Sequence, residues 1–149
     1  MRYVTTSART TERLGQEITR ETAHRFKKRT QALVFALDGP LGGGKTTFTK
    51  GIFKALGVRG RSVSPTFILL RRIKLRDKGS LYHADLYRLE DPRAIQALRL
   101  KEIFAAPENI VVIEWAKHAG RTLPKKTVRV SFEHGRNERE RIIIVREDK

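Results

Sequence analysis

Apolar residues along this chain follow patterns typical of strands in some segments and of helices in others. Residues 32–37 are all apolar, which is typical of a strand buried on both faces in a parallel sheet, and residues 110–113 repeat that pattern. Residues 128–132 alternate apolar and polar positions, residues 134–137 favour a turn, and residues 142–145 are again apolar. The sequence therefore predicts two buried strands followed by an antiparallel hairpin.

A second pair of strands is predicted in the middle of the chain. Residues 78–79 favour a turn, and residues 81–88 are predicted to be the antiparallel partner of the strand before that turn. Residues 2–5 predict a short first strand. The apolar positions of the strand before the turn are Phe67, Leu69, Ile73 and Leu75.

Between these strands, the spacing of apolar residues predicts helices. Thr10 or Thr11 is predicted to cap the first helix, with Glu12 in its first turn, and Gly57 to end the second. Pro92 predicts a short third helix around residues 94–98. The apolar faces comprise Leu14, Ile18 and Phe26 in the first helix and Phe48, Ile52 and Leu56 in the second. Together these elements predict a single α/β domain over residues 1–149 with a mixed, mostly parallel sheet flanked by helices.

Composition excludes several classes of protein. With 149 residues and no cysteine, the chain has no disulfide, no cysteine metal site and no thiol nucleophile. No apolar run approaches a membrane span and no secretory signal is recognisable, so we expect a cytoplasmic protein without a membrane partner. The formal net charge is +16, and residues 38–79 supply half of it with ten basic against two acidic residues. Such a surface suits phosphate polymers or anionic ligands, or simply keeps the protein soluble.

Residues 39–46 read G-P-L-G-G-G-K-T and fit the phosphate-loop pattern G-x-x-x-x-G-K-[ST]. Glycines let backbone N–H groups close around phosphate oxygens, the lysine reaches the β and γ phosphates, and the threonine hydroxyl can ligate Mg²⁺. The loop follows a buried strand and opens a helix, as such a motif requires, which predicts a P-loop NTPase-like fold. The predicted nucleotide-binding residues here are Gly39, Leu41, Gly42, Gly43, Gly44, Lys45, Thr46 and Thr47.

The nucleotide is predicted to be ATP. Guanine-specific relatives of this fold usually carry N-K-x-D, whereas the two asparagines, Asn109 and Asn137, are followed by Ile and Glu. A small-molecule kinase needs a lid and an acceptor site, for which 149 residues leave little room. ATP hydrolysis or ATP-gated binding therefore fits this sequence better than GTP binding or a small-molecule kinase activity.

Two carboxylates are candidates for the catalytic group beside Mg²⁺. Glu114 ends the apolar strand at 110–113 and should emerge beside the phosphate loop, although an ordinary strand-end acid is the alternative. Asp85 lies on a partly apolar strand, where it serves either the site or a salt bridge. His83 and Trp115 are better explained as structural residues. Each of three arginines, Arg136, Arg139 and Arg141, either acts as an arginine finger or lies on a solvated hairpin.

These motifs, in this order, resemble the TsaE family, the small ATPases required for threonylcarbamoyladenosine modification of bacterial tRNA. The resemblance covers nearly the whole chain. The chain departs from the family pattern at Pro40, Arg71 and Lys117, where acidic residues are common. The matching blocks are Thr11, residues 39–48, residues 50–52, S-P-T-F at 64–67, Y-H-A-D-L-Y-R-L at 82–89, V-I-E-W at 112–115 and L-P at 123–124.

The resemblance implies a cytoplasmic, Mg²⁺-dependent ATPase that cycles the TsaB–TsaD pair during modification of adenosine 37 in ANN-decoding tRNAs. It implies that Thr46 and Glu114 bind Mg²⁺, that Asp85 is important for hydrolysis, that Thr66 lies in a switch-like loop and that Thr11 lies near the adenine. A basic RNA-binding module with a vestigial nucleotide site and a small P-loop kinase are the alternatives.

Overall fold

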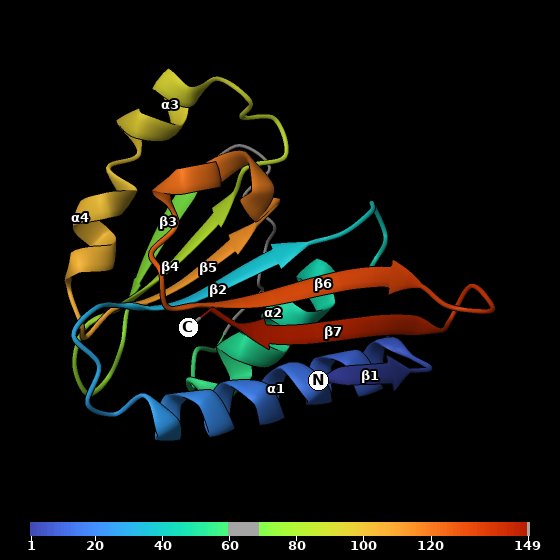
Figure 1. Cartoon of the computed structure of the whole chain (residues 1–149). Coiled ribbons are helices and arrows are strands. Elements are labelled where there is room, and N and C mark those ends of the chain that lie inside the picture. The colour runs from blue at the N-terminus through green and yellow to red at the C-terminus, as the bar shows by residue number, and fades with distance from the viewer. Residues whose placement is uncertain (60–68, 149) are drawn as a thin grey trace.

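The computed structural model describes residues 1–59 and 69–148, whose seven strands form one mixed sheet of order β1-β7-β6-β2-β5-β4-β3 (Figure 1). The α/β fold expected from the sequence is confirmed. The strands are β1 (Arg2–Thr5), β2 (Leu33–Asp38), β3 (Leu70–Lys74), β4 (Ser80–Asp85), β5 (Ile110–Glu114), β6 (Thr127–His134) and β7 (Arg141–Glu147).

The centre of the sheet is parallel and its margins are antiparallel. Strand β2 pairs in parallel with both β5 and β6, and β4 pairs in parallel with β5. The outer pairs β3–β4, β6–β7 and β1–β7 run antiparallel. Because parallel strands end at one edge, the register places Asp85 beside Glu114 and Leu37 on its other side. The two strands predicted to be buried, β2 and β5, therefore bring their carboxyl ends together.

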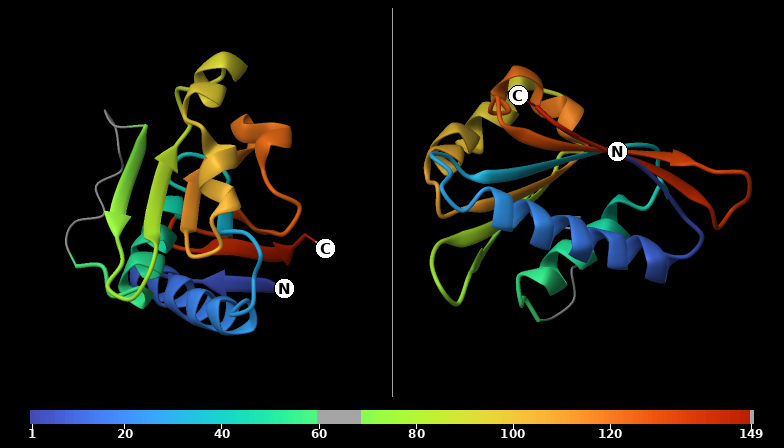
Figure 2. Two further views of the ribbon diagram at one scale, coloured as in Figure 1. Left: turned by 90° about the vertical axis from the view of Figure 1, so that its left-hand side faces the viewer. Right: turned by 60° about the horizontal axis from the view of Figure 1, so that its bottom comes forward.

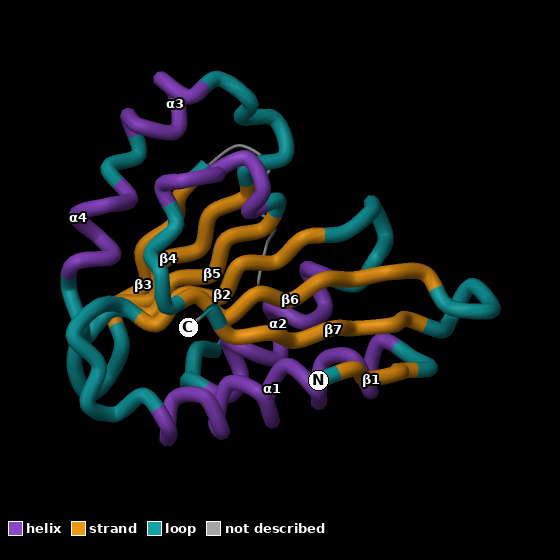
Figure 3. Tube along the Cα trace, viewed as in Figure 1, coloured by secondary structure: helices purple, strands orange, loops and turns teal. Residues whose placement is uncertain are grey.

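Helices cover both faces of the sheet (Figures 2 and 3). Helices α1 (Ala8–Arg25) and α2 (Lys45–Ala55) pack on one face, and the short α3 (Pro92–Ala97), α4 (Leu100–Ala105) and 3₁₀ helix η1 (Ala116–Thr122) pack on the other. A Cβ atom on Gly15 would lie 2.4 Å from the Phe48 carbonyl oxygen, and one on Gly51 would lie 2.1 Å from that of Glu12. These two glycines let α1 and α2 approach closely, which fixes the helix that follows the phosphate loop.

Several predicted boundaries are wrong for local reasons. Helix α1 is capped by Ser7, not by Thr10 or Thr11, because the Ser7 hydroxyl accepts the Thr10 N–H and the Thr10 side chain accepts the Ser7 N–H. Its first turn holds no acidic residue, so Glu12 lies beyond it. Strand β4 ends at Asp85 rather than at residue 88. Helix α3 begins at Pro92 as predicted, while α4 and η1 were not predicted.

Candidate nucleotide-binding site

The phosphate loop joins β2 to α2 in a conformation that only glycines adopt readily. Gly42 and Gly44 have φ angles of +68° and +105°, and Gly44 caps α2. Gly39 has φ of +156°, and a Cβ atom there would lie 2.6 Å from the Phe132 carbonyl oxygen on β6. The loop therefore packs directly on β6, and the exposed N–H groups at the start of α2 face a pocket.

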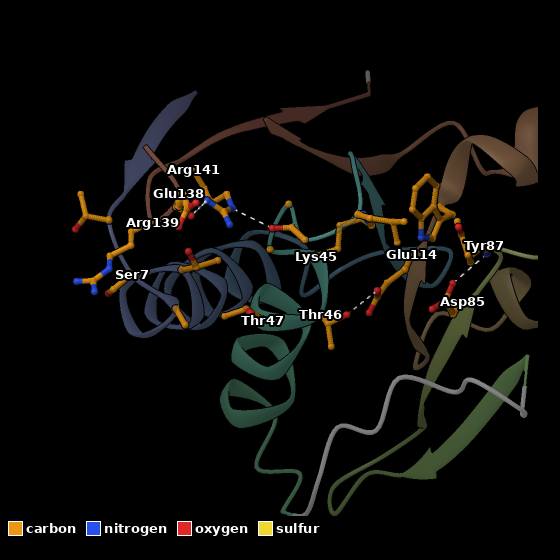
Figure 4. A pocket seen from close by; sticks show the side chains of 18 of the residues that line it. Ser7, Lys45, Thr46, Thr47, Asp85, Tyr87, Glu114, Glu138, Arg139 and Arg141 are labelled. Carbon is orange, nitrogen blue, oxygen red and sulfur yellow. Dashed lines mark hydrogen bonds between the residues drawn. The ribbon is translucent and has the colours of Figure 1, made fainter. Parts of the chain in front are cut away.

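This pocket has a volume of about 780 Å³ and is bounded by four segments. They are the start of α1, the phosphate loop with the first turn of α2, the carboxyl ends of β4 and β5, and the turn between β6 and β7. Figure 4 shows Thr46, Glu114 and Asp85 together at one end and Ser7, Glu138 and Arg139 at the other. The predicted site residues that line it are Thr11, Leu41, Gly42, Gly43, Gly44, Lys45, Thr46, Thr47, Asp85 and Glu114.

Two predicted site residues are not among those lining residues. Gly39 lies behind the loop against Phe132 and acts by letting the loop approach β6. Thr66, predicted to lie in a switch-like loop, is outside the described residues, as are Phe67 and the rest of residues 60–68.

Glu114 is the centre of a buried hydrogen-bonded cluster. Its side chain is only 2% exposed. The Thr46 hydroxyl donates to Oε2 at 3.1 Å, and the Thr49 hydroxyl lies 3.1 Å from Oε1. The Nε2 atom of His83 is also 3.1 Å from Oε1. The carboxylate is thus held on one oxygen by Thr49 and His83 and turned with the other toward the phosphate loop.

His83 is confirmed as a hydrogen-bonded structural residue. It is fully buried between β3 and β5, its ring meets Phe53 edge-on, and its Nδ1 has no partner within the described residues. Because the Glu114 carboxylate only accepts, Nε2 of His83 is the donor in this contact.

Lys45 is buried beside its own loop. Its Nζ donates to the carbonyl oxygens of Gly39 at 2.7 Å and Pro40 at 2.8 Å, and it lies 4.2 Å from the Trp115 ring centre. Burial lowers the pKa of Lys45, and the nearby charges of Glu114, Asp85 and Asp38 oppose that effect. A buried cation is a strong attractor for a phosphate group.

Trp115 and Asp85 flank the same end of the pocket. Trp115 packs on Tyr87, with ring centres 4.8 Å apart, and has a left-handed backbone with φ of +57°. It therefore packs, as predicted, and also lines the site. The Asp85 carboxylate accepts the Tyr87 N–H at 3.0 Å.

The structure adds three lining residues that the sequence did not indicate, and it shows what holds Arg141 and Thr11. Thr6, Ser7 and Ala8 line the far end of the pocket because β1 and the start of α1 fold beside α2. Arg141 donates from Nε to the Gly42 carbonyl oxygen at 3.1 Å, so the hairpin of β6 and β7 holds the phosphate loop. Thr11 is buried, with its hydroxyl 2.7 Å from that of Thr5. Its predicted place near adenine stays a prediction.

The structure shows the contacts or the exposure of the three positions that depart from the family pattern. The Pro40 carbonyl accepts from Lys45 and from the Gly43 N–H, while the Lys117 N–H donates to Asp38 Oδ1 at 2.9 Å. Arg71 is exposed on β3. None of the three disrupts the buried Glu114 cluster.

The donor set fits Mg²⁺ bound together with a nucleotide. Within residues 1–59 and 69–148, no group of three or more His, Cys, Asp or Glu side chains could hold a metal by itself. The Thr46 hydroxyl and the Glu114 carboxylate supply two oxygen atoms on adjacent elements. Mg²⁺ commonly keeps several waters and takes few protein ligands plus substrate phosphates, so this pair is sufficient.

Fold and site together define a phosphate-loop α/β domain. A family model described as "Threonylcarbamoyl adenosine biosynthesis protein TsaE" matches residues 5–143, and the chain belongs to that family. None of the helices in the described part of the chain is long and apolar enough to cross a membrane.

Individual relatives agree with this assignment. The chain is 39% identical over 110 residues to the tRNA threonylcarbamoyladenosine biosynthesis protein TsaE of Bacillus subtilis, and 34% identical over 104 residues to that of Haemophilus influenzae. These alignments cover 72% and 70% of this chain, and 66% and 65% of the relatives' lengths. The Treponema pallidum protein of the same name is 34% identical over 132 residues, covering 89% of this chain and 90% of its own length.

A solved structure has the same fold. The crystal structure of Bacillus subtilis YdiB superposes with a TM-score of 0.75 at 24% identity, covering all of this chain and 86% of that one. At that identity the likeness supports the fold alone.

Proposed function

We propose that this protein is a Mg²⁺-dependent ATPase that acts in threonylcarbamoyladenosine biosynthesis on tRNA. The observation that carries the proposal is the contact between Thr46 of a complete phosphate loop and Glu114 at the end of β5. A hydroxyl and a carboxylate next to the N-terminus of α2 form a site for a cation and the phosphates it accompanies. The names of the relatives supply the pathway.

Each residue has a part that follows from its surroundings. The loop N–H groups and Lys45 would bind the phosphates, while Thr46 and Glu114 would hold Mg²⁺. Mg²⁺-ATP would supply the phosphoryl group for transfer to water. Asp85, in register with Glu114, supplies a second carboxylate at this end of the pocket and would position the attacking water. Thr49 and His83 keep Glu114 oriented.

We further propose that partner proteins complete the site. Lys45 is the one fully buried cation in the described pocket, and Arg141 is held by carbonyl oxygens of its own hairpin and of Gly42. Other P-loop systems gain about 10³–10⁵ in rate from an arginine supplied in trans. The TsaB–TsaD pair in the cytoplasm, acting on adenosine 37 of ANN-decoding tRNAs, is the proposed partner, with Thr66 in the segment that responds to nucleotide.

The test measures phosphate release from ATP by the protein alone, with purified TsaB and TsaD, and with both partners plus tRNA. We expect slow turnover alone and a marked increase with the partners. A Lys45→Ala variant in the same mixtures controls for contaminating ATPases. Equal rates with and without partners would refute the proposal that partners complete the site. Labelled phosphate on a small acceptor, instead of free phosphate, would indicate a kinase.

A further inference from the structure

A second, smaller pocket lies at the edge of the sheet opposite the nucleotide-binding site. It has a volume of about 240 Å³ and lies between the loop that follows α1 and the segment that leads into β6. The Gln31 amide joins the two segments by donating to the Lys126 carbonyl oxygen at 3.1 Å. In Figure 1 this loop lies at the left end of β2 and the phosphate loop lies beyond its right end. A strand of six residues separates them by about 17–20 Å.

The lining of this pocket, here called the Arg29 pocket, is cationic. Four basic side chains and no acidic one contribute to it, namely Arg25, Lys28, Arg29 and Lys126. Arg25 is neutralised by Glu147 on β7. Lys28 and Lys126 are exposed and take part in none of the ion pairs of the described residues.

Arg29 has a buried hydrogen-bond donor that lacks an acceptor within the described residues. Its Nε atom is buried and has no hydrogen-bond partner within the described residues, and its NH1 group makes only a long contact of 3.4 Å to the Phe26 carbonyl oxygen. Burial lowers the pKa of Arg29, an effect that the charge of Glu108 only partly opposes. A buried N–H donor without an acceptor is unfavourable, so an anion that accepts from Nε would stabilise this arrangement.

The helix dipole explains only part of this charge. Basic residues favour the last turn of a helix, and His24 and Arg25 occupy that turn in α1. Lys28 and Arg29 follow the end of the helix, and Lys126 arrives from a different segment. The end of α1 therefore does not account for Lys126, which joins the same cavity.

We propose that the Arg29 pocket binds a backbone phosphate of RNA. A planar guanidinium with two flanking ammonium groups matches a phosphate diester, which accepts several charge-assisted hydrogen bonds. RNA is the favoured source because the net charge is +16 and because, under the proposed function, the substrate is tRNA. The inference rests on that function for the identity of the polymer. Its position at the opposite edge leaves the nucleotide-binding site accessible while RNA is bound.

The test is nucleotide-free binding of fluorescent tRNA, measured by anisotropy between 0.05 and 0.3 M salt. The variant Lys28→Gln with Lys126→Gln removes two exposed charges from the pocket. The matched control, Lys50→Gln with Lys74→Gln, removes two exposed lysines elsewhere. Each lost phosphate contact lowers the slope of log K against log salt by about 0.7–0.9. Because the pocket binds one phosphate, we expect a slope smaller by about 0.7–0.9, equivalent to roughly 5- to 8-fold weaker binding at 0.1 M salt.

A further variant tests the guanidinium itself. Arg29→Lys keeps the charge but loses the planar fork, so tRNA binding should weaken while the melting temperature stays near that of the wild type. Equal losses in the pocket variant and the control would overturn the proposal, because binding would then follow net charge alone. Binding to phosphatidylglycerol vesicles without binding to tRNA would overturn it in favour of a membrane surface. ATP turnover by the pocket variant without RNA should be unchanged, which separates failure here from failure of the proposed ATPase.

Discussion

Replacing Glu114 with glutamine tests the proposed Mg²⁺ site while keeping its surroundings. The amide oxygen can accept from His83 and Thr49 in place of Oε1, and the NH₂ group can donate to the Thr46 hydroxyl, which turns to accept. Loss of the charge weakens three hydrogen bonds and also removes the cost of burying a carboxylate. Because these effects oppose each other, we expect a stability change within about 1 kcal/mol, or about 2–4 °C in melting temperature.

Turnover should respond much more strongly than stability. Glutamine offers a neutral oxygen where the site presents a carboxylate, and in our arrangement its NH₂ group faces Thr46, the other proposed Mg²⁺ ligand. A positioned acid–base or metal-linked group contributes about 10²–10⁴ to rate in other enzymes, so a loss of at least about tenfold is a conservative expectation. The Mg²⁺ concentration needed for half-maximal activity should also rise.

The assay combines phosphate release in the presence of partners, a Mg²⁺ titration and thermal unfolding. Glu114→Ala is the contrasting variant, since it leaves the buried His83 Nε2–H without an acceptor and opens a cavity, at a cost of about 1–3 kcal/mol for the donor alone. It should lose both activity and stability. Wild-type turnover from Glu114→Gln would refute the reasoning and transfer the role to Asp85 or to a partner.

Three further predictions follow from the phosphate loop. Lys45→Ala should weaken Mg²⁺-ATP binding in calorimetry, because it removes the buried cation, and an unchanged affinity would contradict the phosphate-loop assignment. Burial lowers the pKa of Lys45 below its usual 10.5, so the unfolded chain binds more protons between that lowered pKa and 10.5. Across that range, the unfolding free energy of the wild type should therefore rise with pH relative to Lys45→Met, as denaturant titrations at several pH values can check. Gly39→Ala should lower both melting temperature and ATP affinity, since its Cβ would meet the Phe132 carbonyl oxygen, and normal values for both would refute close packing of the loop on β6.

Sequence patterns predicted the parts of the site that follow from local rules. An apolar run ending in Glu114 places its carboxylate at the carboxyl edge of a parallel sheet, and the glycines with Lys45 and Thr46 define the loop beside it. The contact between His83 and Glu114 was not predictable, because it depends on β4 lying next to β5. Partner choice between strands is a tertiary property that no local pattern encodes.

The remaining errors have similar origins. The cap at Ser7 competes with two threonines of nearly equal propensity, and only the closed capping box decides between them. The hydrogen bond from Arg141 to the Gly42 carbonyl oxygen joins residues 99 positions apart. No local pattern indicates such a contact, so the sequence alone suggests a solvated hairpin. Helices α4 and η1 are short and lack a regular apolar period.

The place of β7 has a consequence for how the molecule is made. Strand β1 joins the sheet only through β7, and the phosphate loop is braced by Phe132 and Arg141 near the other end of the sequence. At roughly 5–20 residues per second, a ribosome needs about 5–19 s to add the residues between Thr46 and Arg141. During that interval the nascent chain carries G-P-L-G-G-G-K-T without the contacts that Arg141 makes with it. We therefore expect ATP affinity to arise late and abruptly, after β7 has emerged, rather than to grow as synthesis proceeds.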